Sequence, residues 1–209
     1  MRHEAWRPTI PDGTAGPLRL LNVARLHPVK AQDLLIAALG QLRNQGIAFT
    51  CRIIGEGPQR PDLESRIEAL GLGDRVSLQG ARQAEEVRRQ YDWSQAVVLS
   101  SRSEGTPMTI IEAMAKARPV VAPRITAIPE MIADGRSGLL FAPGSAPDLA
   151  RQLARLASLP KLRAQMGLTA RRQGEELFDL TMNAKKFLAV LALEVPALGL
   201  KPEVAVAPE

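Results

Sequence analysis

The sequence predicts an α/β fold, in which one parallel sheet of about six strands has helices on both faces. Three observations lead to this prediction. Short, almost continuously apolar runs alternate along the chain with longer segments whose apolar residues recur at helical spacing. Unbroken apolar runs of this kind are typical of strands that are covered on both faces. The chain has 209 residues, of which 45% are hydrophobic and 23% charged, as expected for one packed domain.

The first part of the chain supplies three of these strands in order. The apolar run LRLLNVA predicts a strand over 18–24, and the helical spacing that follows predicts a helix over 30–46. AFTCRIIG predicts a second strand over 48–55, and the helix expected over 60–73 ends in glycines. RVSLQG predicts a third strand over 75–80.

The same alternation continues through the second part. A helix is expected over 84–93 and a fourth strand over 95–101. The stretch EGTPMTIIEAMAKARPVV holds a fourth helix, which begins near Pro107, and leads into a fifth strand over 118–123. The other expected elements are a short helix over 128–135, a strand over 137–143, and helices over 146–159, 160–178 and about 181–194.

We expect residues 18–195 to form this single Rossmann-like domain. Residues 1–17 are rich in proline and glycine and are interpreted as a leader or linker, and residues 196–209 as a tail. Right-handed crossovers place every strand-to-helix loop at one edge of the sheet. Ligands of such open sheets bind at the carboxyl ends of the strands. The loops after the first five strands are therefore expected to carry the site.

Charge, cysteine content and hydropathy narrow the class of partner. Lysine and arginine number 27 against 22 acidic residues, a formal charge of +5. This excess suits anionic small ligands or acidic lipid surfaces but is too diffuse to indicate nucleic acid. The single cysteine, Cys51, excludes an internal disulfide and lies in an apolar run, which predicts a buried thiol. Without an apolar signal core or a long apolar run, we expect a cytoplasmic protein, and peripheral contact with the cytoplasmic side of a membrane stays open.

Three loops carry residues suited to a phosphorylated ligand. After the first strand, Arg25 and Lys30 lie five residues apart and could grip a diphosphate, although a solvated surface pair is the alternative. After the second strand, Gly55 and Gly57 allow a close backbone approach or a tight turn. After the third strand, Gly80 permits a turn whose backbone could pair with a nucleobase edge. These glycines do not form the dinucleotide-binding fingerprint, since a third glycine in register is missing.

The loop after the fourth strand, SSRSEGTPM, is the most informative. Its Glu104 could accept hydrogen bonds from sugar hydroxyls, and Gly105 and Thr106 follow directly. With Pro107 in the first turn of a helix, the backbone amides of Met108 and Thr109 would be free to bind phosphate at the positive helix end.

A second carboxylate, Glu112, lies more than one turn inside this helix, among apolar neighbours. Its side chain would lean back toward the first turn, where it could accept hydrogen bonds from the two hydroxyls of a ribose. A plain surface glutamate is the alternative. After the fifth strand, Thr126, Ala127 and Glu130 could line the sugar side, although Glu130 fits equally well as a first-turn acid of the short helix.

Taken together, these residues resemble the retaining glycosyltransferases of the GT-B fold known as glycosyl transferases group 1, or family 4. The matching segments follow the family's order: NVARLHPVKAQDLLIAA, RIIGEGPQRPDLE, RVSLQG, VVLSSRSEGTPMTIIEAMAKARPVVA and IPEMIADGRSGLLF. The resemblance covers about residues 18–192. Its most specific part is the E-x(7)-E spacing of Glu104 and Glu112, joined to the upstream pair Arg25 and Lys30.

The resemblance implies a donor site for a nucleotide-diphospho-sugar with a UDP, GDP or ADP moiety. Arg25 and Lys30 would bind the diphosphate, Glu112 the ribose, and Glu104 the transferred sugar near the reacting centre. On this basis Glu104, Arg25 and Lys30 are the expected catalytic residues. Transfer would proceed with retention, and neither a metal nor another cofactor is expected.

The sequence departs from the family in two respects. It matches only the second, donor-binding half of a GT-B enzyme, so that an acceptor domain is expected upstream or on a partner chain, and self-association through an exposed apolar face stays open. The family often has glycine after the lysine, within A-x-G-x-PVV and before PE. The residues here are Ala31, Ala117-Arg118 and Thr126-Ala127. The last two replacements predict a narrower or altered sugar pocket, and Ala31 is a mild change at a helix start.

Three alternatives differ from a catalytic donor domain. The first is a nucleotide-binding subunit or regulator without catalysis, which the missing acceptor half would favour. The second is a GT-B enzyme that epimerises a nucleotide sugar, which the E-x(7)-E set argues against. The third is a dinucleotide oxidoreductase, which the glycine pattern disfavours. The sequence does not reveal the sugar, the base or the acceptor.

Overall fold

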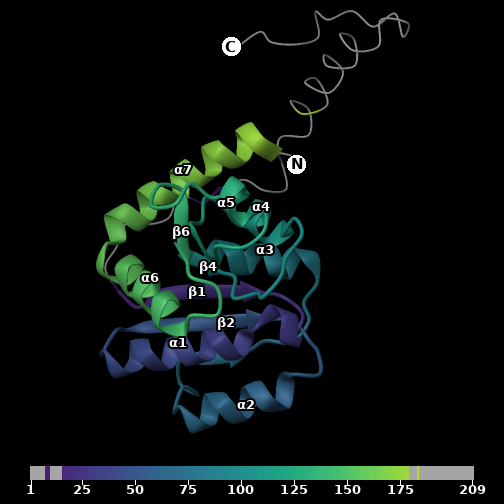
Figure 1. Cartoon of the computed structure of the whole chain (residues 1–209), viewed down its shortest axis with the longest axis vertical. Coiled ribbons are helices and arrows are strands. Elements are labelled where there is room, and N and C mark those ends of the chain that lie inside the picture. Colours follow the sequence, from purple (N-terminus) through teal and green to yellow (C-terminus); the bar gives the residue numbers. More distant parts are fainter. Residues whose placement is uncertain (1–7, 10–15, 179–182, 184–209) are drawn as a thin grey trace, which may run out of the picture.

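The computed structural model describes residues 8–9, 16–178 and 183. Its centre is a parallel sheet of six strands in the order β3-β2-β1-β4-β5-β6 (Figure 1). The strands are β1 (Leu18–Val23), β2 (Phe49–Ile54), β3 (Val76–Leu78), β4 (Ala96–Val98), β5 (Val120–Pro123) and β6 (Gly138–Phe141). The predicted α/β fold with one parallel sheet is therefore confirmed.

Helices cover both faces of the sheet. They are α1 (Gln32–Asn44), α2 (Arg60–Ala69), α3 (Ala84–Trp93), α4 (Met108–Ala115), α5 (Ile128–Met131), α6 (Ala146–Ser158) and α7 (Pro160–Phe178), with a 3₁₀ turn η2 (Pro28–Lys30) before α1. Strand residues point alternately to the two faces. Leu20 therefore packs in the core under α1, α2 and α6, while its neighbour Leu21 packs in the core under α3, α4, α5 and α7.

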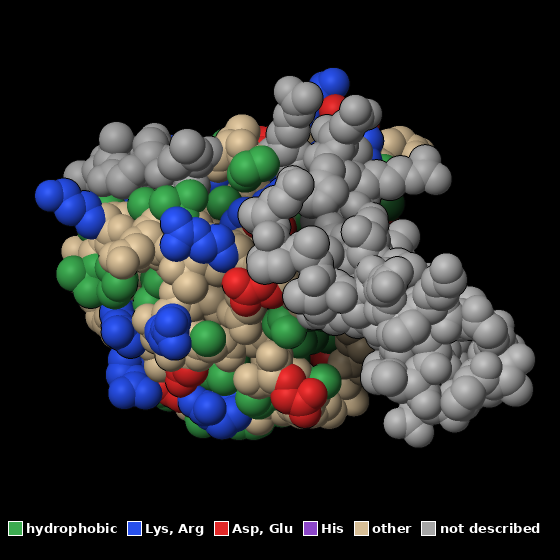
Figure 2. Space-filling model, turned by 90° about the horizontal axis from the view of Figure 1, so that it is seen from above, with side chains coloured by type: hydrophobic (Ala, Val, Ile, Leu, Met, Phe, Trp, Pro, Cys, Tyr) green, Lys and Arg blue, Asp and Glu red, His purple; other side chains and the backbone are tan. Residues whose placement is uncertain are grey.

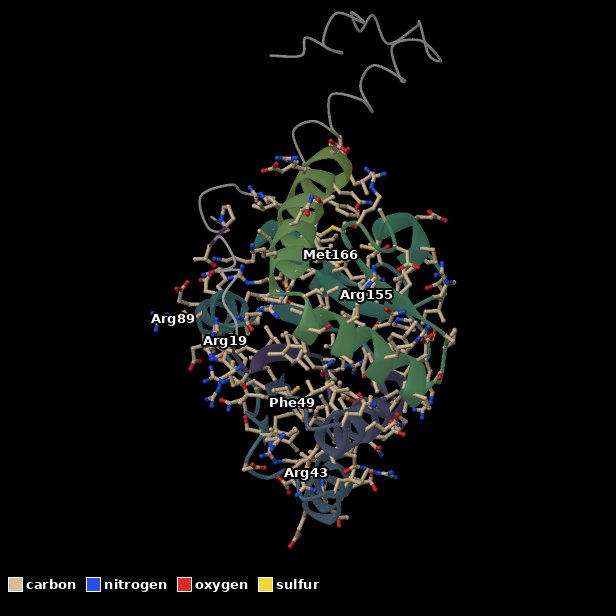
Figure 3. All side chains as sticks on the ribbon, turned by 90° about the vertical axis from the view of Figure 1, so that its left-hand side faces the viewer. Arg19, Arg43, Phe49, Arg89, Arg155 and Met166 are labelled. Carbon is tan, nitrogen blue, oxygen red and sulfur yellow. The ribbon has the colours of Figure 1, made fainter. Side chains whose placement is uncertain are left out.

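Side chains in the view of Figure 3 follow this layering. Phe49 of β2 and Met166 of α7 are almost fully buried, at 2% and 1% exposure. Arg89 of α3 lies at the surface in the same view, with 73% of its side chain exposed. Lysine and arginine side chains are scattered over the described part of the face in Figure 2, with acidic side chains among them. The cationic excess is thus diffuse on this face.

The order of the strands reverses between β1 and β4. The chain runs outward from β1 to β2 and β3, and then returns to place β4 on the other side of β1. Leu20 and Leu21 of β1 pair in register with Ala96 and Val97 of β4. The loops after these two strands leave the same edge of the sheet but run to opposite faces of it. Open α/β sheets bind ligands in the crevice between two such loops. Those loops contain Lys30 and Glu104.

Among the described residues, three other than glycine have a positive φ, and each lies at one of the family's glycine positions. They are Ala31 (φ 48°), Ala117 (φ 53°) and Thr126 (φ 44°). Ala31 divides the helix expected over 30–46, so that Lys30 ends the turn η2 and α1 begins at Gln32. The family's glycines are therefore explained here by backbone conformation, and this chain adopts that conformation without them.

Some expectations about boundaries change, and others are not tested. Pro107 is the N-cap residue of α4 and not part of its first turn, since its ψ of 107° is extended. Within the predicted leader, Thr9 is held by Arg118, whose Nη1 and Nη2 donate to the Thr9 carbonyl and hydroxyl at 2.6 Å each. The helix expected over 181–194, apart from residue 183, and the tail over 196–209 lie outside the described residues.

Two simpler expectations concern Cys51 and membrane segments. Cys51 is 1% exposed in β2, and burial raises the pKa of its thiol to about 12, as expected for a structural cysteine. Among the described helices, none combines the length and apolar character needed to cross a bilayer.

Candidate functional site

The loops after β1 and β4 meet in an ion pair between Lys30 and Glu104. Lys30 Nζ donates to Glu104 Oε1 at 2.7 Å and to Oε2 at 2.9 Å. Ser101 Oγ donates to the same Oε1 at 2.5 Å. The Glu104 side chain is only 9% exposed and that of Lys30 is 23% exposed, so the pair is shielded from solvent. Two of the four charged residues singled out in the sequence are therefore in direct contact, although 74 positions separate them.

A cavity of about 260 Å³ opens beside this pair. Its lining is Asn22, Val23, Ala24, Lys30, Leu99, Ser101, Glu104, Thr106, Pro107, Met108 and Thr109. Five residues predicted from the sequence are among them: Lys30, Glu104, Thr106, Met108 and Thr109. Pockets that enclose a whole small ligand usually measure about 300–1,000 Å³. The cavity is therefore large enough for only part of a nucleotide sugar.

A larger hollow of about 550 Å³ lies elsewhere, between α2 and the edge strand β3. It runs along β3 from Gly73 and Asp74, which precede the strand, to Leu78 at its end, and it shares no lining residue with the smaller cavity. Its shallow surface is lined by Ile67, Val76 and Leu78 and bordered by charges of both signs. We assign the site to the smaller cavity, because the paired charges and the helix end converge there.

The N-terminus of α4 forms one wall of the cavity. The described residues supply no backbone acceptor for the amides of Met108 and Thr109, whereas the amide of Ile110 donates to the Pro107 carbonyl at 3.0 Å. Free amides at a helix start carry partial positive charge, which favours phosphate. The expected free donors are thus present, although the helix starts one residue later than predicted.

Glu112 lies on the second turn of α4, behind the cavity wall. The Tyr91 hydroxyl, from α3, donates to Glu112 Oε2 at 2.7 Å. Burial raises the pKa of the Glu112 carboxyl, and the hydrogen bond from Tyr91 acts in the opposite direction. Glu112 is half-buried and bonded, and so is not a plain surface glutamate. It does not itself line the cavity, but Thr109, one turn earlier, does.

Arg25 is exposed and does not line the cavity. Its side chain makes no ion pair or hydrogen bond with the described residues, although its carbonyl accepts from Gln32 Nε2 at 3.0 Å. The four charged residues thus lie along one edge of the sheet, but only Lys30 and Glu104 touch. Binding roles for Arg25 and Glu112 stay predictions.

The predicted glycines have reasons that need no ligand. A Cβ on Gly55 would lie 1.9 Å from the Ala24 carbonyl oxygen, and one on Gly57 would lie 2.3 Å from that of Leu26. Gly80 has a φ of 75°, and its carbonyl accepts from the Gly55 amide at 3.0 Å. These glycines let the loops after β1, β2 and β3 pack closely, while Gly105 has open space around it.

The loop after β5 is separate from the cavity. Thr126 is exposed, with a positive φ, and precedes Ala127, the N-cap of α5. Glu130 is exposed in the first turn of α5, as the simpler of the two interpretations predicted. None of the three lines the cavity.

Sequence reasoning missed three polar residues at the site. Tyr91 and Ser101 hold the two carboxylates, and neither stands out from its neighbours in the sequence. Asn22 could have been noticed as the one polar residue in an otherwise apolar strand end. Its Nδ2 donates to the Val98 carbonyl at 2.8 Å, and its buried Oδ1 has no partner among the described residues. The described part of the chain contains no group of three or more potential metal-binding histidine, cysteine or acidic side chains.

Comparison with known proteins agrees with this arrangement. The family model "Glycosyl transferases group 1" matches residues 13–173. Alpha-D-kanosaminyltransferase of Streptomyces kanamyceticus is 35% identical over 151 residues, which are 72% of this chain and 39% of that protein. The chain thus spans about two fifths of the length of this curated relative.

Solved structures match at the level of one domain. The C-terminal domain of the group 1 protein LpcC from Francisella tularensis has a TM-score of 0.75 at 23% identity, covering 86% of this chain and 99% of that domain. An S. aureus TarM mutant in complex with UDP and other ligands has a TM-score of 0.74 at 26% identity, covering 87% of this chain and 37% of that one. The fold therefore corresponds to one half of the GT-B fold, and the chain belongs to the glycosyl transferases group 1 family.

Proposed function

We propose that this chain binds a nucleotide-diphospho-sugar at the cavity between the loops after β1 and β4, as the donor half of a retaining glycosyltransferase. One observation carries the proposal. The Lys30–Glu104 pair and the free amides at the start of α4 line the same cavity. A cation and a positive helix end suit a diphosphate, and a carboxylate suits sugar hydroxyls. The UDP in the TarM complex supports the same ligand class.

In this proposal each group acts on a different part of the donor. Lys30 and the amides of Met108 and Thr109 bind the diphosphate, and Arg25 reaches it from the rim. As the nucleoside diphosphate departs, they stabilise the negative charge that develops on it. Glu104 accepts from hydroxyls of the transferred sugar, and Glu112 from the ribose.

The paired state of Lys30 has a consequence for binding. Its ammonium group has three donors, and Glu104 takes two of them. A diphosphate that binds Lys30 must therefore share the ammonium group with Glu104 or replace it. Ser101 remains bonded to Glu104 Oε1 and would keep that carboxylate in place.

The acceptor site is the part that we propose lies outside this chain. The 260 Å³ cavity holds only part of a nucleotide sugar, and the chain spans 39% of its curated relative. A second domain, from the same protein or from a partner chain, would complete the cleft and supply the acceptor. A cytoplasmic location belongs to the same proposal.

Isothermal titration calorimetry with UDP, GDP and ADP and their sugar conjugates tests the donor site. Lys30→Ala should weaken the diphosphates more than the matching nucleosides, because only the diphosphates meet its charge. Glu112→Ala should weaken nucleotides by roughly 1–3 kcal/mol, as for lost hydrogen bonds to a charged group. Glu130→Ala, at an exposed acid that does not line the cavity, is the matched control. Binding of none of these ligands by the wild type would refute the proposal.

A non-catalytic nucleotide-binding subunit is the second candidate, and the incomplete cavity favours it. The two functions differ in whether sugar is released or transferred. Release of nucleoside diphosphate from a nucleotide sugar by the wild type, and not by Glu104→Ala, would exclude the non-catalytic function. If the wild type and Glu104→Ala bind the nucleotide sugar equally tightly and neither turns it over, even when an acceptor domain is supplied, the non-catalytic function is supported.

A further inference from the structure

Tyr91 is the only tyrosine of the chain, and its ring lies wholly inside the core. It packs between the sheet and α4 in the apolar cluster that contains Leu21, Val97 and Ile110. The backbone at this point is also fixed, because the Tyr91 carbonyl accepts from Ser94 Oγ and from Arg118 Nε, each at 2.9 Å. The position of the hydroxyl is therefore determined by the fold.

This hydroxyl donates to Glu112 Oε2 at 2.7 Å. Burial, followed by the nearby Glu112 charge, raises the pKa of Tyr91 well above its ordinary value. The phenol therefore keeps its proton throughout the range in which Glu112 titrates. The phenol also lies near Thr109, which lines the cavity and whose Oγ1 donates to the Val23 carbonyl at 3.3 Å. The tyrosine is thus close both to the cavity wall and to the carboxylate one turn behind it.

The charged groups around Glu112 are directed elsewhere. Lys116, one turn further along α4, pairs with Asp92 at 3.0 Å. Arg171, from α7, which packs on α4, pairs with Glu175 at 2.7 Å and donates to the Ala115 carbonyl. Among the described residues, the phenol of Tyr91 is the group that supports the ionised form of Glu112, against the effect of burial.

We propose that Tyr91 is a positioning residue that holds the Glu112 carboxylate in one orientation and keeps it ionised for ligand binding. Oε2 is occupied by the phenol, and Oε1 is the oxygen left to accept from a ligand. A glutamate whose carboxylate is fixed before binding loses less side-chain entropy when a ligand arrives. The inference rests on the proposed function, in which that ligand is a ribose.

Tyr91→Phe is the decisive variant, since it removes one oxygen and keeps the ring that fills the core. With glutamate labelled by ¹³C, NMR follows the titration of the Glu112 carboxyl directly, and Glu112→Gln assigns its signal. We expect the pKa of Glu112 to be higher in Tyr91→Phe than in the wild type. Ser158→Ala is the matched control, because it removes a hydroxyl from the end of another helix, α6, where it bonds to the Arg155 carbonyl and contacts neither Tyr91 nor Glu112. This measurement needs no ligand.

The second measurement compares a ribonucleotide with its 2′-deoxy form. The probe is UDP, GDP or ADP, whichever binds the wild type most tightly. We expect the wild type to prefer the ribonucleotide, and Tyr91→Phe to lose about tenfold or more of its ribonucleotide affinity. Below neutral pH, the loss of affinity on acidification should begin at a higher pH in the variant, because Glu112 becomes protonated earlier.

The two measurements separate the inference from the function on which it rests. An unchanged Glu112 pKa in Tyr91→Phe would overturn the role of Tyr91, whatever the nucleotides do. A raised pKa together with equal wild-type affinity for ribo- and deoxyribonucleotides would uphold the Tyr91–Glu112 pair and refute the ribose assignment. A raised pKa with a reduced ribonucleotide preference supports both.

Discussion

The left-handed backbone of Thr126 predicts that glycine at this position would stabilise the protein. Thr126 has a φ of 44°, and β-branched residues are rare outliers in this region. A residue with a Cβ pays about 1–2 kcal/mol for the left-handed conformation. Glycine avoids this cost, but about 0.4–1 kcal/mol of the gain is lost because the unfolded chain has more conformational freedom with glycine. Because Thr126 is exposed, no buried contact is lost, and Thr126→Gly should stabilise by about 1 kcal/mol.

The two alanines with positive φ provide the matched comparison. Ala31 and Ala117 are 1% and 0% exposed, so their methyl groups are buried. Removing a buried methyl costs about 0.8 kcal/mol, which cancels most of the conformational gain. We expect Ala31→Gly and Ala117→Gly to be nearly neutral, and Thr126→Ala to fall between Thr126→Gly and the wild type.

Urea unfolding and thermal melting measure these differences. A gain of 1 kcal/mol should raise the melting temperature by about 2–4 °C in a protein of this size. The reasoning fails if Thr126→Gly is less stable than the wild type, or if both alanine-to-glycine variants gain more than it does. Nucleotide affinity should be measured in parallel. If the strained conformation of Thr126 is needed for binding, Thr126→Gly should be more stable than the wild type and should bind nucleotide more weakly.

Two further predictions concern Gly55 and Glu112. Gly55→Ala would place a Cβ 1.9 Å from the Ala24 carbonyl oxygen, so we expect it to lower the free energy of unfolding by about 1–3 kcal/mol in urea titrations; Gly105→Ala, which meets nothing within 4 Å, is its control. Glu112→Gln should raise the free energy of unfolding at neutral pH. Burial makes the pKa of Glu112 higher in the folded protein than in the unfolded chain. Between these two pKa values the folded protein binds more protons, so its stability falls as the pH rises. Glu112→Gln has no carboxyl at this position and should not show this loss of stability. An identical pH dependence of the free energy of unfolding in the two proteins would contradict this reasoning.

The sequence was sufficient to predict the sheet and to place the loops that carry Lys30 and Glu104 at the same edge of it. Both follow from local patterns combined with one rule, that parallel crossovers bring all strand-to-helix loops to the same edge. The rule does not state which side chains touch. Tyr91 and Ser101 reach their carboxylates through packing between elements far apart in sequence, and nothing in their spacing indicates this. The same limit applies to Gly55 and Gly57. Glycine at these positions predicts a close approach of the backbone to something, but the sequence does not distinguish a ligand from a neighbouring loop.

The spacing of the two glutamates has a structural explanation in the start of α4. Glu104 precedes the helix by four positions and is held in the loop by Lys30 and Ser101. The free amides of Met108 and Thr109 come next, and Glu112 follows on the second turn, held by Tyr91. This order, carboxylate, anion site, carboxylate, is the order of sugar, diphosphate and ribose in the proposed donor. A shift of Glu112 by one or two positions would turn its side chain to another face of the helix, because helical side chains change direction by about 100° per residue. The E-x(7)-E spacing therefore carries functional information that neither glutamate carries alone, and moving Glu112 to the adjacent position 111 should abolish ribose recognition as fully as removing it.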